Sequence, residues 1–459
     1  MRVIGKIAKW LLVFLVVGVL GLGLWLWFAP PALIRVAAGY SAKIVCSNVF
    51  MAGRDAEDVL EGDVQAPGHP ILKLIQVDVD RETGTVEADL FGLFGGGLAV
   101  FRQGFGCAAV PDGDVVAARA GHPQVEGAGG SVPPPGQDMA TARDPAIEAI
   151  LDDPAMTGPG MRAVVVIHEG NIVGERYGAG FSAEIPLLGW SMTKTVTAAI
   201  IGTLIADGRL AVEEQNLFED WARDNRGPIS LQSLMAMSSG LEFDEDDANV
   251  SDVTRMLYLQ PDMAGFASAK PLAGELGNTF SYSSGTTVIL SRIWQNAFEE
   301  PADALIWPHE ALFEPLGMDS AVMETDARGA FVGSSYMYAT ARDWARFGQF
   351  LLQDGVWNGQ SILPEGYVAW MRDPAPASNG EYGRGQVWLH GPMVDTPEGE
   401  NPDEGYVLPQ DAYWLLGHDG QRIVIVPSLD LVVVRLGLTP DSLGHKPQGM
   451  VEAIARVVE

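Results

Sequence analysis

The stretch Leu187-Leu188-Gly189-Trp190-Ser191-Met192-Thr193-Lys194 runs directly into an apolar segment that stops at Gly208. Apolar residues followed by a terminal glycine predict a helix that begins near Ser191. A serine and a lysine three residues apart lie on one helix face, so the Lys194 amine can reach the Ser191 hydroxyl. Backbone N–H groups at a helix start are unpaired and carry positive partial charge. That position suits a serine that attacks a carbonyl and then faces an oxyanion, although an ordinary capping serine with a solvated lysine has the same pattern.

The composition is that of a folded, loop-rich protein. The chain has 459 residues, of which 47% are hydrophobic and 19% charged, with 54 Gly and 29 Pro. This length allows more than one domain. The formal net charge is −30 and no basic stripe is present, which argues against nucleic acid as a partner because phosphate binding needs clustered Lys and Arg. The seven histidines lack the spacing of paired metal ligands, so we expect no metal and no cofactor.

Residues 1–30 have the features of a membrane anchor. An uncharged run from Trp10 to Ala29 follows the basic residues Arg2, Lys6 and Lys9. As a helix this run spans about 30 Å, enough to cross the hydrocarbon core. It exceeds the apolar core of a signal peptide, so we expect an uncleaved anchor and keep a cleaved signal as the alternative. The basic flank stays in the cytoplasm, which predicts a single-pass protein of the bacterial inner membrane with a periplasmic catalytic domain.

The two cysteines, Cys46 and Cys107, both follow the membrane segment. A disulfide persists in an exported region. Between the cysteines, β-rich patterns alternate with turn residues such as Glu82-Thr83-Gly84, which is typical of short strands. We therefore expect a small β-rich module over 31–110 closed by a Cys46–Cys107 disulfide. Two unpaired buried thiols are the alternative.

The rest of the chain divides into a linker and a larger domain. Residues 111–144 are rich in Gly, Pro, Ala and acid, and Gly127–Gly136 in particular cannot hold regular structure, so we expect a linker or long loop. Within 145–459, strand hairpins at 163–177 and 422–436 flank mostly helical patterns. Strands at both ends with helices between predict an α/β (α+β) domain. Its antiparallel sheet would come from both ends, flanked by helices and joined to a helical lobe.

Three motifs carry a resemblance to a known family: Ser191-Met192-Thr193-Lys194, Tyr282-Ser283-Ser284-Gly285 and His418-Asp419-Gly420-Gln421. Their order and rough spacing resemble those of serine β-lactamase and penicillin-binding-type hydrolases. Two further stretches, Leu234–Phe243 and Gly333-Ser334-Ser335, resemble the class C-related branch that holds 6-aminohexanoate-dimer hydrolases and family VIII esterases. The resemblance implies a serine hydrolase that cleaves a small-molecule ester or amide through an acyl-enzyme.

The resemblance also implies a role for each motif residue. Ser191 would be the nucleophile, and Tyr282 beside Lys194 would take its proton and pass it to the leaving group. A charged lysine beside a phenol stabilises the phenolate, although a core tyrosine is the alternative. Backbone N–H groups of Ser191 and Gln421 would form the oxyanion hole. Gly420 would let the substrate approach that strand edge closely.

Two departures from the β-lactamase pattern concern the substrate. Many β-lactamases have Lys-Thr-Gly in place of His418-Asp419-Gly420, and Asn in place of Ser284. Without the lysine of that motif, the site lacks a fixed cation to bind the carboxylate of a β-lactam. We therefore expect the substrate to be an ester or amide. A β-lactam or D-Ala-D-Ala peptide enzyme is the first alternative, and a non-catalytic envelope binding protein is the second.

Substrate contacts and the acidic run complete the expectations for the site. We expect Ser284 and His418 to contact the substrate, with a structural histidine as the alternative for His418. The run Asp244–Asp247 could border the cleft, but an acidic run is usually a solvated loop, and we expect one here.

Overall fold

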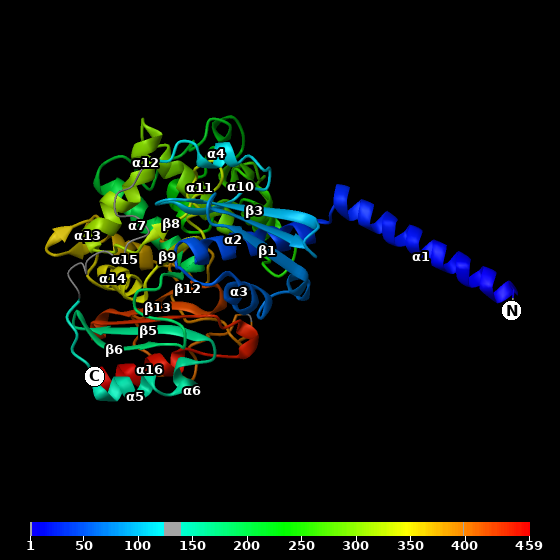
Figure 1. The fold of residues 1–459 in the computed structure, drawn as a ribbon. Helices are drawn as coiled ribbons and strands as arrows, with labels where there is room; N and C mark the ends of the chain where they lie inside the picture. Colours follow the sequence, from blue (N-terminus) through cyan, green and yellow to red (C-terminus); the bar gives the residue numbers. More distant parts are fainter. Residues whose placement is uncertain (1, 124–138, 398) are drawn as a thin grey trace.

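The computed structural model describes residues 2–123, 139–397 and 399–459. Helix α1 (Arg2–Phe28) leaves the body of the protein as an isolated rod (Figure 1). Its segment Lys9–Phe28 is long and apolar enough to cross a membrane, with a mean hydropathy of 2.6 and no buried residue. The helix ends before Pro30-Pro31, because proline lacks an N–H and disfavours helical geometry in the residue before it. A signal sequence near an N-terminus can meet the same criteria of length and hydropathy.

Helix α2 (Ala32–Phe50) is the centre of the N-terminal module, which the sequence predicted to be β-rich. It packs along a four-stranded antiparallel sheet in the order β1-β2-β3-β4: β1 (Ile75–Asp80), β2 (Thr85–Leu90), β3 (Phe94–Arg102) and β4 (Gly106–Ala109). Gly97 allows this close packing, since a β-carbon there would overlap the Ala38 carbonyl group. Cys46 of α2 and Cys107 of β4 form a disulfide. Short helical turns join α2 to the sheet: α3 (Ala56–Val59), η1 (Leu60–Gln65) and η2 (Pro70–Leu74).

Residues 111–144 contain a short helix that the sequence did not predict. Helix α4 (Val115–Arg119) begins after Asp114, whose carboxylate accepts a hydrogen bond from the Ala117 N–H group. Such an N-cap satisfies a donor that the first helical turn leaves unpaired. The Gly127–Gly136 stretch lies outside the described residues.

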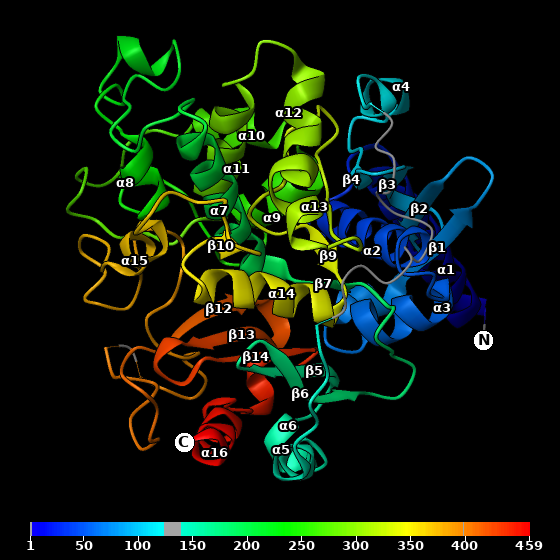
Figure 2. The ribbon, with the colours of Figure 1, turned by 90° about the vertical axis from the view of Figure 1, so that its left-hand side faces the viewer.

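A five-stranded antiparallel sheet forms the centre of the larger domain. Its order is β12-β13-β14-β5-β6, with β5 (Met161–His168), β6 (Asn171–Tyr177), β12 (Tyr413–Gly417), β13 (Gln421–Val426) and β14 (Leu431–Gly437). Strand β14 pairs with β5, so the two ends of the domain share one sheet, as predicted. Figure 2 shows α14 (Ala341–Leu352) on one side of the sheet. The other side holds α5 (Pro145–Leu151), α6 (Pro154–Thr157) and α16 (Gln448–Val458).

The helical lobe packs beyond α14 and surrounds α7 (Thr193–Ala206), whose residues from Thr193 to Leu204 are all buried. Its other helices are α8 (Leu231–Met235), α9 (Asp252–Leu259), α10 (Met263–Ser268), α11 (Ser284–Gln295), α12 (Pro301–Pro308), α13 (Glu314–Leu316) and α15 (Tyr367–Arg372). Two small sheets complete the lobe: β7 (Leu187–Leu188), β9 (Met337–Ala339) and β8 (Val322–Met323), and the pair β10 (Val356–Trp357) and β11 (Gln360–Ser361). Further short turns are η3 (Trp190–Met192), η4 (Trp221–Arg223), η5 (His309–Phe313), η6 (His418–Gly420), η7 (Pro427–Leu429) and η8 (Asp441–Leu443).

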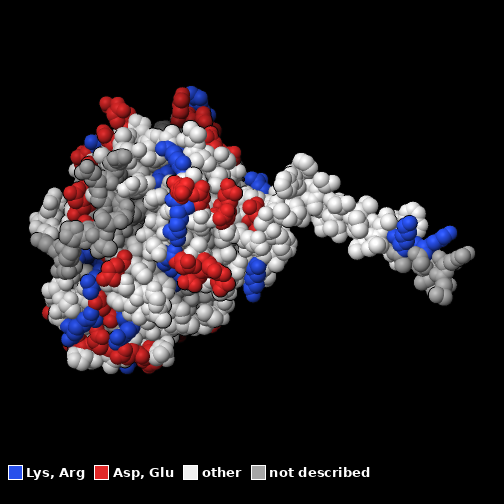
Figure 3. Space-filling view, in the orientation of Figure 1, with Lys and Arg blue, Asp and Glu red and all other residues white. Residues whose placement is uncertain are grey.

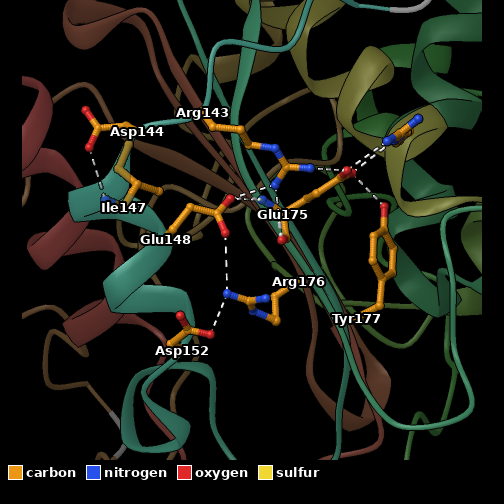
Figure 4. A network of polar contacts seen from close by, with 9 residues as sticks. Arg143, Asp144, Ile147, Glu148, Asp152, Glu175, Arg176 and Tyr177 are labelled. Carbon is orange, nitrogen blue, oxygen red and sulfur yellow. Dashed lines mark hydrogen bonds and ion pairs between the residues drawn. The ribbon is translucent and has the colours of Figure 1, made fainter.

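A charged network fastens the start of the larger domain to its sheet (Figure 4). The Glu175 carboxylate on β6 accepts hydrogen bonds from Arg143, from the Tyr177 hydroxyl at 2.9 Å and from Arg342 of α14 at 2.7 Å. Burial acts to raise the pKa of Glu175, but these donors outweigh it and lower the pKa below its ordinary value. The network therefore favours the charged carboxylate.

Buried polar contacts join the N-terminal module to the larger domain. Lys43 of α2 forms an ion pair with Glu324 at 2.5 Å, and both side chains are at most 1% exposed. Glu324 also accepts hydrogen bonds from the Ser47 hydroxyl at 2.8 Å and the Cys107 N–H group at 2.6 Å. The module is thus joined to the larger domain through the buried Glu324 carboxylate, whose donors Lys43, Ser47 and Cys107 all come from the module, next to its disulfide.

Candidate active site

Ser191 lies where strand β7 gives way to helix α7, within the single turn η3. Trp190, directly before it, has φ of +48°, a left-handed conformation that costs a residue with a β-carbon about 1–3 kcal/mol. This sharp bend separates the strand from the helix and places Ser191 at their junction. Lys194, one turn further, is buried, and its Nζ atom lies 3.0 Å from the Ser191 Oγ atom.

The Lys194 amine has three hydrogen-bond acceptors. Besides Ser191, it donates to the Ser284 Oγ atom at 3.0 Å and to the Ser334 carbonyl oxygen at 3.1 Å. Three acceptors match the three hydrogens of an ammonium group. The first two sequence motifs and the Gly333-Ser334-Ser335 stretch therefore meet at one nitrogen atom.

Tyr282 contacts the same amine with the face of its ring. The Lys194 Nζ atom lies 4.7 Å from the ring centroid. Trp388 and Tyr382 hold the ring from the other sides, with centroids 5.3 and 5.8 Å away. In the described parts of the chain, no hydrogen bond joins the Tyr282 hydroxyl to another residue. The structure thus brings Tyr282 beside Lys194, with its hydroxyl free to meet a substrate.

Glu245 is the site residue that sequence reasoning placed in a solvated loop. One of its carboxylate oxygens accepts the Ser284 N–H group at 2.7 Å, and the other accepts the Ser284 hydroxyl. Burial raises the pKa of Glu245, while the Lys194 charge and the Ser284 hydrogen bonds oppose that rise. The ring of Phe243, two residues before Glu245, packs where a β-carbon on Gly285 would lie, which holds the start of the acidic run against α11.

His418 lies between two carboxylates at the edge of the site. Its Nδ1 atom is 3.0 Å from Asp247, and its Nε2 atom is 3.3 Å from Asp419. Its ring also meets the Trp190 ring edge-on, with centroids 5.5 Å apart. Burial lowers the pKa of His418, but the hydrogen bond to Asp247 and the nearby carboxylate charges outweigh it and raise the pKa to about 8. His418 therefore contacts Trp190, the residue directly before Ser191. With this pKa, most His418 side chains are protonated at neutral pH.

Gly420 and Gln421 stabilise the turn between β12 and β13. The Gln421 side chain is buried and exchanges hydrogen bonds with Gly437, donating at 2.6 Å and accepting at 3.0 Å. Gly420 has φ of +86°, and a β-carbon there would lie 2.8 Å from the Arg435 guanidinium. Turn geometry and Arg435 thus account for this glycine without any ligand.

Strand register indicates which backbone donors face the site. At the open edge of β12, Trp414 exchanges two hydrogen bonds of 2.8 Å with Trp388. Alternate residues of a strand point their N–H groups the same way. Leu416 of β12 is therefore also expected to direct its N–H group to the open edge, and His418, which follows the extended Gly417, is the next residue of that series. Gly417 and Gln421 are partners across the hairpin.

The end of β12 also lies beside the nucleophile. A β-carbon on Gly417 would overlap the carbonyl oxygen of Gly189, two residues before Ser191. By contrast, a hollow of about 880 Å³ lies around α13, α14 and β10, with Glu314, Gln349 and Trp357 in its wall. None of the motif residues lines that hollow.

The fold is of the β-lactamase type, and comparisons with known proteins agree. The Beta-lactamase family model matches residues 151–444, so the chain belongs to the beta-lactamase family. The 6-aminohexanoate-dimer hydrolase of Paenarthrobacter ureafaciens is 22% identical over 340 residues, which are 66% of this chain and 78% of that protein. The predicted resemblance to serine β-lactamases and penicillin-binding-type hydrolases is confirmed, and family membership supports hydrolase activity.

Two solved structures show the same fold. A Bacillus anthracis protein provisionally named as a 6-aminohexanoate-dimer hydrolase superposes with a TM-score of 0.56 at 24% identity, over 70% of this chain and 87% of that one. A penicillin-binding protein homologue from Caulobacter crescentus gives a TM-score of 0.52 at 16% identity, over 70% and 99% of the two chains.

Proposed function

We propose that this protein hydrolyses an ester or amide bond of a small molecule through an acyl-enzyme on Ser191. The observation that carries the proposal is the Lys194 amine, buried and 3.0 Å from the Ser191 hydroxyl at the start of a helix. An unassisted serine hydroxyl is a weak nucleophile and needs a base within this distance. Such an arrangement serves acyl transfer better than it serves a binding module.

Proton transfer involves Lys194 and Tyr282 together. The resemblance implied Tyr282 as the base, but we assign this role to Lys194, whose Nζ atom lies 3.0 Å from the Ser191 Oγ atom. Lys194 accepts the Ser191 proton when its amine is neutral, as Ser191 attacks the carbonyl carbon. Tyr282, whose ring lies against the same amine, has a free hydroxyl that delivers a proton to the leaving group. Water then attacks the acyl-enzyme with the same groups in reverse, which restores the serine.

The oxyanion is stabilised by backbone N–H groups. Ser191 supplies one of them. For the second we favour His418 over Gln421, because His418 follows the β12 residues whose alternate N–H groups face the open edge, and Gln421 is paired across the hairpin. The charged His418 ring adds positive potential beside the same position.

Glu245 acts as a positioning residue. Its carboxylate fixes the Ser284 hydroxyl, which in turn holds the Lys194 amine at 3.0 Å. Its negative charge also faces the cation that Lys194 becomes after it accepts a proton. Glu245 thus orients the base and stabilises its protonated form.

Charge at the site favours an ester or amide over a β-lactam. Where many β-lactamases have a lysine, this chain has His418, and the carboxylates Asp247 and Asp419 flank it. Two acids repel the carboxylate that β-lactams carry. The similar Paenarthrobacter protein is named for cleaving a linear amide, which supports the same substrate class.

The apolar N-terminal segment supports a location of this activity at a bilayer. Along α1 the surface is uncharged apart from Lys and Arg near its free end (Figure 3). A basic flank before an apolar span keeps the N-terminus in the cytoplasm, so the catalytic domain would face the periplasm. We propose a single-pass inner-membrane hydrolase, with cleavage of the segment as the alternative.

Turnover by a matched pair of variants tests the proposed function. Ser191→Ala should abolish hydrolysis of p-nitrophenyl acetate and of a linear amide, because the acyl-enzyme cannot form. Ser182→Ala removes a hydroxyl that bonds Glu184 at the surface, and it should leave both rates unchanged. Undiminished hydrolysis by the Ser191→Ala protein would reject the proposal, and faster turnover of a chromogenic cephalosporin than of either substrate would favour the β-lactam alternative.

A further inference from the structure

We infer that the N-terminal module itself rests on the lipid bilayer through an apolar tip formed by Leu74, Phe91 and Leu93. This inference rests on the proposal that α1 crosses a membrane. The three side chains are 44%, 53% and 58% exposed, although each is large and apolar. Phe91 and Leu93 belong to the turn between β2 and β3, and the Phe91 N–H group bonds the Leu74 carbonyl oxygen at 2.9 Å. The tip is therefore one connected feature of the sheet.

The tip lies at the end of the module where α1 leaves it. Strand β3 runs along α2: a β-carbon on Gly95 would overlap Ile34 in the first turn of α2. At the other end, the Phe101 ring stacks on Phe50, with centroids 5.1 Å apart. The turn before β3 must therefore project past the start of α2, toward the end of α1. Figure 1 shows β3 reaching the root of α1.

Contacts of α1 support the same placement. Leu26, near the end of α1, packs against the module's apolar cluster together with Phe94, the first residue of β3. Trp25 and Trp27 are 52% and 62% exposed on the same helical turn. Tryptophan is enriched at the level of lipid headgroups, so this turn marks the expected outer interface. The tip lies at that level.

Chemistry identifies the bilayer as the partner. Single exposed apolar residues are ordinary, but a connected group beside a membrane span has lipid directly in reach. Apolar side chains that enter the boundary between headgroups and acyl chains leave water. Exposed basic residues, Arg35 in the first turn of α2 and Lys73 beside Leu74, can meet lipid phosphates. Together with α1, the tip would give the module two membrane contacts and fix how the catalytic domain faces the surface.

Site-directed labelling tests the inference in the full-length protein. Both native cysteines form the disulfide, so a cysteine introduced by Leu93→Cys can carry an environment-sensitive fluorophore alone. The protein is reconstituted in vesicles of phosphatidylcholine and phosphatidylglycerol, with and without brominated phosphatidylcholine as a quencher. We expect the label at position 93 to be blue-shifted and quenched several-fold more than a label placed by Val407→Cys. Val407 is 67% exposed and lies just before Leu408, which packs on the α5 and α16 side of the sheet.

A third label separates failure of the inference from failure of the anchor. Leu20→Cys places the fluorophore in the middle of α1. Quenching at position 20 with none at position 93 would overturn the inference and leave the anchor intact. No quenching at either position would reject the anchor and the inference with it. Equal quenching at positions 93 and 407 would also overturn the inference, because lipid contact would then not be specific to the tip.

Discussion

The negative charge of Glu245 acts on Lys194, the proposed base, and its carboxylate holds Ser284 beside that lysine. Glu245→Gln keeps an oxygen for Ser284 but removes the negative charge that faces Lys194. We expect kcat to fall by about tenfold to a hundredfold, short of the loss seen when a proton-transfer group is removed. Asp246→Asn, an exposed acid in the same run, is the matched control and should leave kcat unchanged.

His418 makes the site sensitive to mild alkali. With its pKa raised to about 8, His418 is charged at neutral pH and loses its proton as the pH rises through that value. Asp247 and Asp419 are then uncompensated beside the oxyanion position, so kcat/KM for a neutral ester should fall as the pH rises through about 8. His418→Gln should remove this step from the profile. His390→Gln, at a histidine whose pKa is raised by its own partner Asp403, should leave it in place.

At the level of residues, spacing along one helix was enough to pair Ser191 with Lys194, since helix geometry alone brings them together. Ser284 and Tyr282 could be assigned to the site only from the order of the sequence motifs. No local rule brings together residues that lie far apart in the sequence. Glu245 could not be separated from a solvated loop, as four consecutive acids carry no periodicity. The Gln421 donor was predicted from motif order, and strand register instead favours His418.

Among the elements, helix α2 carries the buried ion pair between Lys43 and Glu324, and we expect its loss to destabilise the module strongly. Lys43→Ala would leave Glu324 charged and buried without its partner, which typically costs about 3–5 kcal/mol. Urea unfolding should show this loss in the free energy of unfolding. Lys73→Ala, at an exposed lysine of the same module, should change it little. A smaller loss in the double variant Lys43→Met with Glu324→Leu would identify the lone charge as the cause, and no loss in Lys43→Ala would contradict the buried ion pair.

The five-stranded sheet could be predicted because its hairpins are local patterns at both ends of the domain. Helix α2 could not, because it is apolar on nearly every side and has no amphipathic period to mark it. It is buried between the sheet of the module and the larger domain, which removes the polar face that a surface helix would show. Helix α4 was missed for another reason, since a single N-cap at Asp114 starts it within a run of small residues.

For the molecule as a whole, the disulfide joins the helix and the sheet that dock on the larger domain. Cys46 and Cys107 are 61 residues apart, and closing a loop of that length is worth roughly 4 kcal/mol when it is unstrained. The double variant Cys46→Ala with Cys107→Ala should therefore unfold at lower urea concentration. Treating the variant with a reductant should change nothing further, whereas the natural protein should lose stability on reduction. Equal stability of the natural protein with and without reductant would contradict a structural role for the bridge.

The N-terminal module and the larger domain share part of their apolar core, although the composition of the linker suggested two separate units. Val36 and Phe105 of the module belong to the same apolar cluster as helix α7 and the helical lobe. Sequence composition identifies a loop between two units, but it carries no information on the surface that each unit buries against the other. The docked module lies behind Trp190, so the proposed nucleophile depends on both units for its surroundings.

Covalent trapping of the nucleophile tests the central claim most directly. The full-length protein is treated with a fluorophosphonate, which reacts with activated serines, and the labelled peptide is identified by mass spectrometry. We predict one adduct, on Ser191, that is lost in Ser191→Ala and strongly slowed in Lys194→Ala, because the Lys194 amine lies 3.0 Å from the Ser191 hydroxyl one helical turn away. The Ser284 hydroxyl lies equally close to that amine but donates to the Glu245 carboxylate, so we expect no adduct there. An adduct on a different serine, or none in a protein that still hydrolyses the ester, would contradict the account.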